Sequence, residues 1–123
     1  MADITDVDIN TGLVNRSDRS FLTDVVVSIS SSGDNTVITG IPGKVIRVHR
    51  VALTAPSGSP VDINFKNGST SMGTFKAVGS LVLSNDDDPS GYRPWFVLSD
   101  GNSLVLNLSS AVAVTGKISY RQQ

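Results

Sequence analysis

The sequence has 123 residues, and 10 Lys plus Arg against 11 Asp plus Glu give a formal net charge of −1. A nucleic-acid-binding surface usually carries a basic excess, so this balance argues against nucleic acid as a partner. Cysteine is absent, which excludes disulfides, thiolate metal sites and cysteine nucleophiles. No apolar run approaches the ~20 residues that span a membrane, and the acidic start MADITDVDIN is not typical of a signal peptide.

The composition favours an all-β protein. Val, Ile, Thr and Ser are abundant, whereas Glu is absent and Ala and Lys are modest, so residues that favour helices are scarce. All acidic residues are Asp, which favours turns. The length fits one domain that folds without covalent cross-links.

Residues 1–24 differ from the rest of the chain. Short apolar pairs are separated by Asp, Asn, Thr and Ser, and only residues 4–9 could form a short strand. We interpret this segment as an extended N-terminal arm that becomes ordered against a neighbour. The alternative is a first edge strand of the same domain.

From residue 25 onward, strands alternate with turns. Residues 25–29 are β-branched, with Val25, Val27 and Ile29 sharing one face. Residues 30–35 form a predicted turn, residues 36–39 a short strand, and Gly40-Ile41-Pro42-Gly43 another turn.

Residues 44–54 form the longest predicted strand. Ile46 and Val48 share one face, whereas Val51 and Leu53 share the other. This switch near His49 indicates a bulge, or a bend that passes the strand between two sheets.

Further strands complete the pattern. Asn67-Gly68 is typical of a hairpin turn, and Gly116 marks a bulge or a close backbone approach in the last strand. These strands are predicted at residues 61–66, 73–78, 81–84, 93–98, 104–109 and 112–121.

The pattern predicts about eight strands at intervals of roughly 8–14 residues, with no helical segment between them. The architectures consistent with it are an antiparallel sandwich, a jelly roll and a small barrel. We expect residues 25–123 to form an antiparallel β-sandwich of the jelly-roll type.

Neither His49 nor the aspartates indicate catalysis. His49 lies within the longest strand without an evident nucleophile, and we interpret it as a half-exposed strand residue or a subunit contact. Asp86, Asp87 and Asp88 are typical of a solvated turn; calcium binding is the alternative, although the EF-hand pattern is missing. We therefore expect no catalytic, cofactor or metal-binding residues.

The candidate interaction residues fall in two places. Tyr92, Arg93 and Trp95 form an aromatic and basic group that could contact a protein, stack on a sugar or cover the core. In the N-terminal arm, the candidates are Arg16, Arg19, Phe21 and Leu22.

Three motifs carry a resemblance to a known class of protein. Gly40 begins G-x-x-G-K-x-I-x-V, Phe65 begins F-x-N-G, and Val112 begins V-x-V-x-G-x-I-x-Y. Their order over residues 37–121 resembles small virion structural proteins of tailed bacteriophages, of the capsid decoration, cement or head-fibre type.

The resemblance implies a non-enzymatic protein that binds and stabilises a capsid surface as a homo-oligomer. Its partners would be the major capsid protein or other virion proteins, with no nucleic acid and no membrane, and it would reside in the virion after assembly in the host cytoplasm. The alternative is a carbohydrate- or receptor-binding module of a phage fibre or tail.

Overall fold

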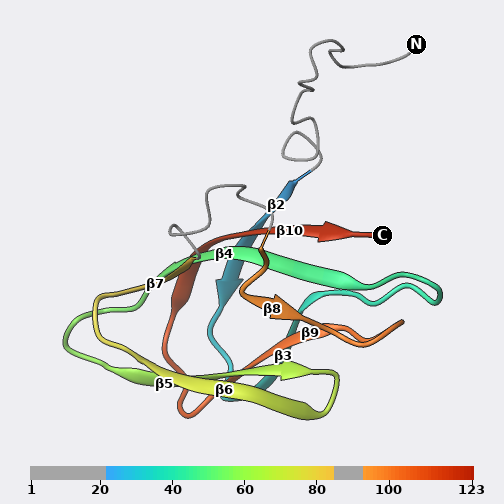
Figure 1. Cartoon of the computed structure of the whole chain (residues 1–123). Coiled ribbons are helices and arrows are strands. Elements are labelled where there is room, and N and C mark those ends of the chain that lie inside the picture. The colour runs from blue at the N-terminus through green and yellow to red at the C-terminus, as the bar shows by residue number, and fades with distance from the viewer. Residues whose placement is uncertain (1–21, 85–92) are drawn as a thin grey trace, which may run out of the picture.

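The computed structural model describes residues 22–84 and 93–123, and this part of the chain is all β (Figure 1). The prediction of an all-β antiparallel sandwich is confirmed. The described strands are β2 (Thr23–Ile29), β3 (Gly33–Ile38), β4 (Ile46–Thr54), β5 (Val61–Asn67), β6 (Thr70–Ala77), β7 (Ser80–Ser84), β8 (Phe96–Val97), β9 (Leu104–Leu108) and β10 (Val114–Gln122).

The strands form two packed sheets. One sheet, here called the β4 sheet, has the order β2-β10-β4-β7, and β8 also pairs with β4. The other, the β5 sheet, has the order β3-β9-β5-β6. The antiparallel pairs are nested around the β5–β6 hairpin: β4 pairs with β7, β3 with β9, and β2 with β10. Strands from the two ends of the described chain therefore lie side by side (Figure 1).

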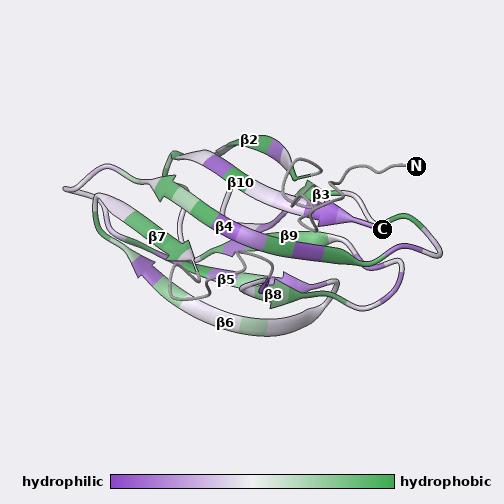
Figure 2. Cartoon of the chain, turned by 45° about the horizontal axis from the view of Figure 1, so that its top comes forward, coloured by the Kyte–Doolittle hydropathy of each residue, from purple (hydrophilic) through white to green (hydrophobic). Residues whose placement is uncertain are grey.

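The core lies between the facing surfaces of the two sheets. Apolar and polar residues alternate along the strands, as the colouring of β4 and β10 in Figure 2 illustrates, so each strand points one apolar row inward. Phe65 stacks on Phe96 with ring centroids 5.2 Å apart, and Phe75 meets Phe65 edge to face at 5.7 Å. The largest fully buried side chains are Phe65, Ile46, Leu53, Ile63, Leu104, Leu106, Leu108 and Ile118, with Val27, Val48, Val51 and Val61.

A bulge in β4 explains the switch in its alternation. Ser119 of β10 lies opposite Arg50, but Tyr120 lies opposite Val48, so His49 is an extra residue in β4. The predicted bulge is confirmed. The expectation that the two apolar pairs face opposite sides is wrong, because the extra residue restores the phase and buries all of Ile46, Val48, Val51 and Leu53. The strand stays in one sheet and does not cross to the other.

Several strand boundaries differ from the sequence-based expectation, three of them with a clear reason. Strand β2 begins at Thr23, so the last two residues assigned to the arm belong to the sheet, where Asp24 accepts a hydrogen bond from Ser119 Oγ (2.6 Å). Strand β3 already begins at Gly33, within the predicted turn, because Gly33 pairs with Leu108. The strand predicted at residues 93–98 contains only Phe96–Val97, which pair with Val48 and Arg47 at one end of β4.

Two turn and glycine predictions agree with the structure. The hairpin expected near Asn67 joins β5 to β6 through Gly68 and Ser69, and the positive φ of Gly68 (63°) at the first central position is typical of a type II′ turn. Gly116 lies in β10 between Val27 of β2 and Leu53 of β4. A Cβ atom there would overlap the carbonyl oxygen of Ala52, so the expected close backbone approach is present.

We expect the substitution Gly116→Ala to lower the free energy of unfolding by about 2 kcal/mol or more, because the added methyl group forces β10 and β4 apart. Urea unfolding measures this change. Gly43→Ala is the matched control, since Gly43 also has a positive φ (85°) but open space around its Cβ position. An equal effect of both substitutions would contradict the steric explanation.

Candidate interaction surfaces

The sequence-predicted interaction residues do not form one surface in the described part of the chain. Leu22 directly precedes β2, at one edge of the β4 sheet, whereas Trp95 precedes β8 at the opposite edge. Arg93 is exposed. The other candidates and the three loop aspartates lie outside the described residues, namely Arg16, Arg19, Phe21, Tyr92, Asp86, Asp87 and Asp88.

Trp95 is attached to the core by both its backbone and its ring. Its backbone N–H donates to the carbonyl oxygen of Val48 (2.6 Å). The half-buried indole packs against the core and meets the Phe96 ring edge to face, with centroids 6.4 Å apart. This arrangement corresponds to the core-covering role considered for the aromatic group, and it leaves only part of the indole accessible.

The outer face of the β4 sheet carries exposed valines that the sequence analysis did not single out. Val26 of β2 is 74% exposed and Val82 of β7 is 56% exposed. The register places them in one row across the sheet, because Val26 pairs with Lys117, Lys117 with Ala52, and Ala52 with Val82. We call this row, Val26–Lys117–Ala52–Val82, the valine row.

Charged and polar residues flank the valine row. The neighbouring row contains Asp24, Ser119, Arg50 and Ser84, and the row on the other side contains Ser28, Thr115, Thr54 and Ser80. Asp24 lies 4.0 Å from Lys117 Nζ and so links two of the rows. The sequence pattern that could have revealed these valines is an apolar residue at a position where the alternation predicts an outward-facing side chain. Val26 lies between the inward-facing Val25 and Val27, and Val82 lies between Leu81 and Leu83.

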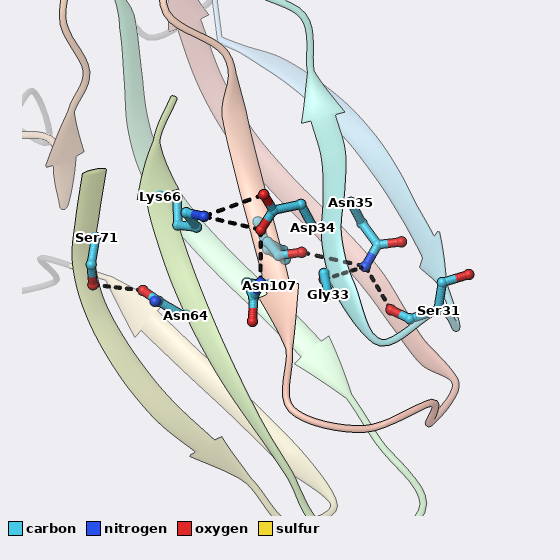
Figure 3. Close-up of polar contacts among 9 residues, drawn as sticks. Ser31, Gly33, Asp34, Asn35, Asn64, Lys66, Ser71 and Asn107 are labelled. Carbon is cyan, nitrogen blue, oxygen red and sulfur yellow. Dashed lines mark hydrogen bonds and ion pairs between the residues drawn. The ribbon is translucent and has the colours of Figure 1, made fainter. Parts of the chain in front are cut away.

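The outer face of the β5 sheet is instead a network of polar side chains (Figure 3). Asp34 of β3 accepts hydrogen bonds from Asn107 of β9 (2.7 Å) and from Lys66 of β5 (3.1 Å). These two bonds lower the pKa of Asp34, that from Asn107 most, because both favour the carboxylate. Further along the face, Ser71 donates to Asn64 (2.7 Å).

Three loops are joined at one end of the sandwich. The backbone N–H of Gly40 donates to Ser103 Oγ (2.8 Å), and that of Gly43 donates to Asp100 (2.9 Å). Asn67 connects the β5–β6 hairpin to the same region through its bonds with Ser99 and Asn102. The glycine-containing segment therefore acts as a turn whose amides bind the protein's own side chains.

His49 is buried on the bulge of β4. It is only 7% exposed, so the expectation of a half-exposed residue is wrong. Its Nε2 atom has no hydrogen-bond partner among the described residues. Burial lowers the pKa of His49 most, and the nearby charges of Arg121 and Arg47 lower it further, since all three disfavour the imidazolium.

The described residues contain neither a metal-ligand group nor a membrane-spanning helix. Within residues 22–84 and 93–123, no three His, Cys, Asp or Glu side chains are grouped as they would be to hold a metal ion. The same residues contain no helix with the length and hydropathy of a membrane span. Comparison of the chain with known protein families, curated proteins and solved structures found no match.

We expect the protein to lose stability as the pH falls below about 6.5, the ordinary pKa of histidine. The pKa of His49 is lowered in the folded state, so the unfolded chain binds the proton more readily. The neutral imidazole of His49 therefore favours folding fully only above pH 6.5, and this contribution is lost as the pH falls. Urea unfolding at pH 7.5, 6.5 and 5.5 measures this loss. His49 is the one histidine in the sequence, so His49→Gln should have a flatter profile; equal slopes for both proteins would refute the assignment.

Proposed function

We propose that this chain is a non-enzymatic structural protein of a tailed-phage virion that binds the capsid surface through protein–protein contacts. The observation that carries the proposal of protein contact is the valine row on the outer face of the β4 sheet. The phage assignment is supported by the resemblance over residues 37–121.

The valine row has the composition of a protein interface. Val26 and Val82 lie three strand spacings apart, about 14 Å, with Lys117 and the small Ala52 between them. Water gains entropy when such apolar side chains are covered, and the flanking Asp24 and Arg50 can supply a polar rim. An exposed sheet face of this kind can pack against another protein surface.

The topology supports an oligomeric shell-binding role. We infer that the fold is a jelly roll, because the antiparallel pairs are nested and consecutive strands alternate between the sheets, except at the β5–β6 hairpin and at β7 and the short β8, which share the β4 sheet. We propose that several copies form a symmetric homo-oligomer, in which each copy presents the same patch to the shell.

We expect Val82→Asp and Val26→Asp to weaken binding to capsid shells at least tenfold, because each buries a charge in the contact. Both side chains are exposed, so the variants should fold. Co-sedimentation with phage heads that lack this protein measures binding, and light scattering measures the oligomeric state.

Thr74→Asp is the matched control, since Thr74 is exposed on β6 of the other sheet. Equal loss of binding for the control and the valine variants would argue against the β4 sheet as the contact surface. A wild-type protein that stays monomeric and ignores the shells would contradict the proposed function itself.

The alternative, a carbohydrate-binding module, is supported by the polar network of the β5 sheet. Asp34, Asn107 and Asn64 are side chains that pair readily with sugar hydroxyls, and their hydrogen bonds hold them in place. This function predicts retention on glycan resins and its loss in Asn107→Ala. A virion structural protein that binds only through its β4 sheet would not be retained.

A further inference from the structure

Strand β2 is an edge strand whose outer side has no neighbour among the described strands. It pairs with β10 on one side of the β4 sheet, and Figure 2 shows it at the rim of the sandwich. Within residues 22–84 and 93–123, no strand pairs with its other side. The backbone N–H and C=O groups along that side are therefore available to another strand.

The other described edge strands have features that hinder the addition of a strand, whereas β2 has none of them. Bulges interrupt β3 at Val37 and β6 at Met72, and β7 and β8 contain only five and two residues. Strand β2 has seven residues in unbroken register with β10, and its sequence TDVVVSI contains neither Lys nor Pro. Bulges, short length, Lys and Pro are the common means by which sheet edges avoid association.

The one charged residue of β2 does not block this edge. Asp24 accepts a hydrogen bond from Ser119 Oγ (2.6 Å) and lies 4.0 Å from Lys117 Nζ. Both partners belong to β10, so the carboxylate interacts with the strand that β2 already contacts. Asp24 is also the second residue of β2, which leaves the centre of the strand to three consecutive valines.

We infer that β2 is the contact between two copies of this chain, which pair β2 with β2 in antiparallel fashion about a two-fold axis at Val26. This inference rests on the proposed function and names the surface that joins the copies of the homo-oligomer. The axis is perpendicular to the sheet, so the two β4 sheets become one continuous sheet. Val26 then lies opposite Val26 of the second copy, Val25 opposite Val27, and Asp24 opposite Ser28.

The register centred on Val26 is favoured by both hydrophobic contact and charge. Val26 is 74% exposed, more than any other large apolar side chain of the described residues, and its Cβ atom would lie about 5 Å from that of its counterpart. On the inner face, the half-buried Val25 would gain Val27 of the second copy as a neighbour. Registers centred on Val25 or Asp24 would place Asp24 opposite a valine or opposite a second Asp24.

Pairing of the two β2 strands also extends the valine row. The rows of the two copies would meet at their Val26 ends and form one line across the joined sheets, from Val82 of one copy to Val82 of the other. The perpendicular axis keeps both outer faces on the same side. A second copy at β2 therefore doubles the length of the surface proposed to contact the shell, which favours this occupant over an unrelated strand.

Sedimentation equilibrium of the whole chain over a series of micromolar concentrations tests the inference. We expect a reversible equilibrium between monomer and dimer, because a seven-residue edge strand offers a small contact. A wild-type protein that stays monomeric throughout the series would overturn the inference.

Charge changes at Ser28 test the register itself. Ser28→Asp should weaken the dimer at least fivefold, because it places a carboxylate opposite Asp24 of the second copy twice in each dimer. Ser28→Lys should tighten the dimer for the opposite reason. Within one chain, position 28 is four residues from Asp24, about 13 Å along the strand, so the charge effect requires the second copy.

Ser80→Asp is the matched control. Ser80 is exposed on β7 and lies in the same row of the outer face as Ser28, at the opposite edge of the β4 sheet. Both serines are exposed, so all three variants should fold, and circular dichroism checks this. Equal weakening by Ser80→Asp, or the same response to both changes at Ser28, would overturn the inference.

Two further outcomes separate this inference from its alternatives. Loss of the dimer in Val82→Asp would show that the copies meet through their outer faces, and the β2 contact would be refuted. If the wild type sediments with shells but the Ser28 variants do not change its association, the inference fails and the function stands. If the Ser28 variants shift the dimer as expected but the protein ignores shells, the function fails and the β2 contact stands.

Discussion

The extra residue in β4 is the constraint on which both the core and the β4 sheet surface depend. If β4 had no bulge at His49, either Ile46 and Val48 or Val51 and Leu53 would face outward, because side chains alternate strictly along a regular strand. The bulge keeps all four in the core and allows β4 to pair with β10 along its whole length. It also places an imidazole beside arginines, so the feature that completes the core creates the unusual electrostatics of the outer face.

The two outer faces differ in how their polar groups are satisfied. On the β5 sheet, Asp34, Asn107 and Lys66 neutralise and hydrogen-bond one another, so this face gains little from further contacts. The β4 sheet instead exposes Val26 and Val82 in one row of its outer face. A surface that is costly to leave uncovered gains most from association. This contrast favours the β4 sheet as the side that meets another protein.

The fold could be predicted from the sequence further than the surfaces could. Alternation alone predicted the inward row of β10, in which Val114 and Ile118 are buried, and it located the irregularity near His49. It could not distinguish a bulge from a crossing between sheets, because both reverse the phase of the alternation. The surfaces depend on register: Arg47 and Arg121 become neighbours only through the pairing of β4 with β10, which no local pattern specifies. The candidates chosen by residue type, such as Trp95, turned out to lie partly against the core.

The nested pairing of strands has a consequence for how the chain reaches its folded state. Asp24 and Ser119 share a hydrogen bond although 95 positions separate them. Contacts between such distant positions form slowly, because the entropy of closing the intervening loop is lost before the contact compensates for it. During synthesis, β2 must wait unpaired until β10 has left the ribosome, and β3 must wait for β9. The exposed edge of β2 is therefore a place where a chaperone, or a neighbouring nascent chain, can bind before its own partner strand is made.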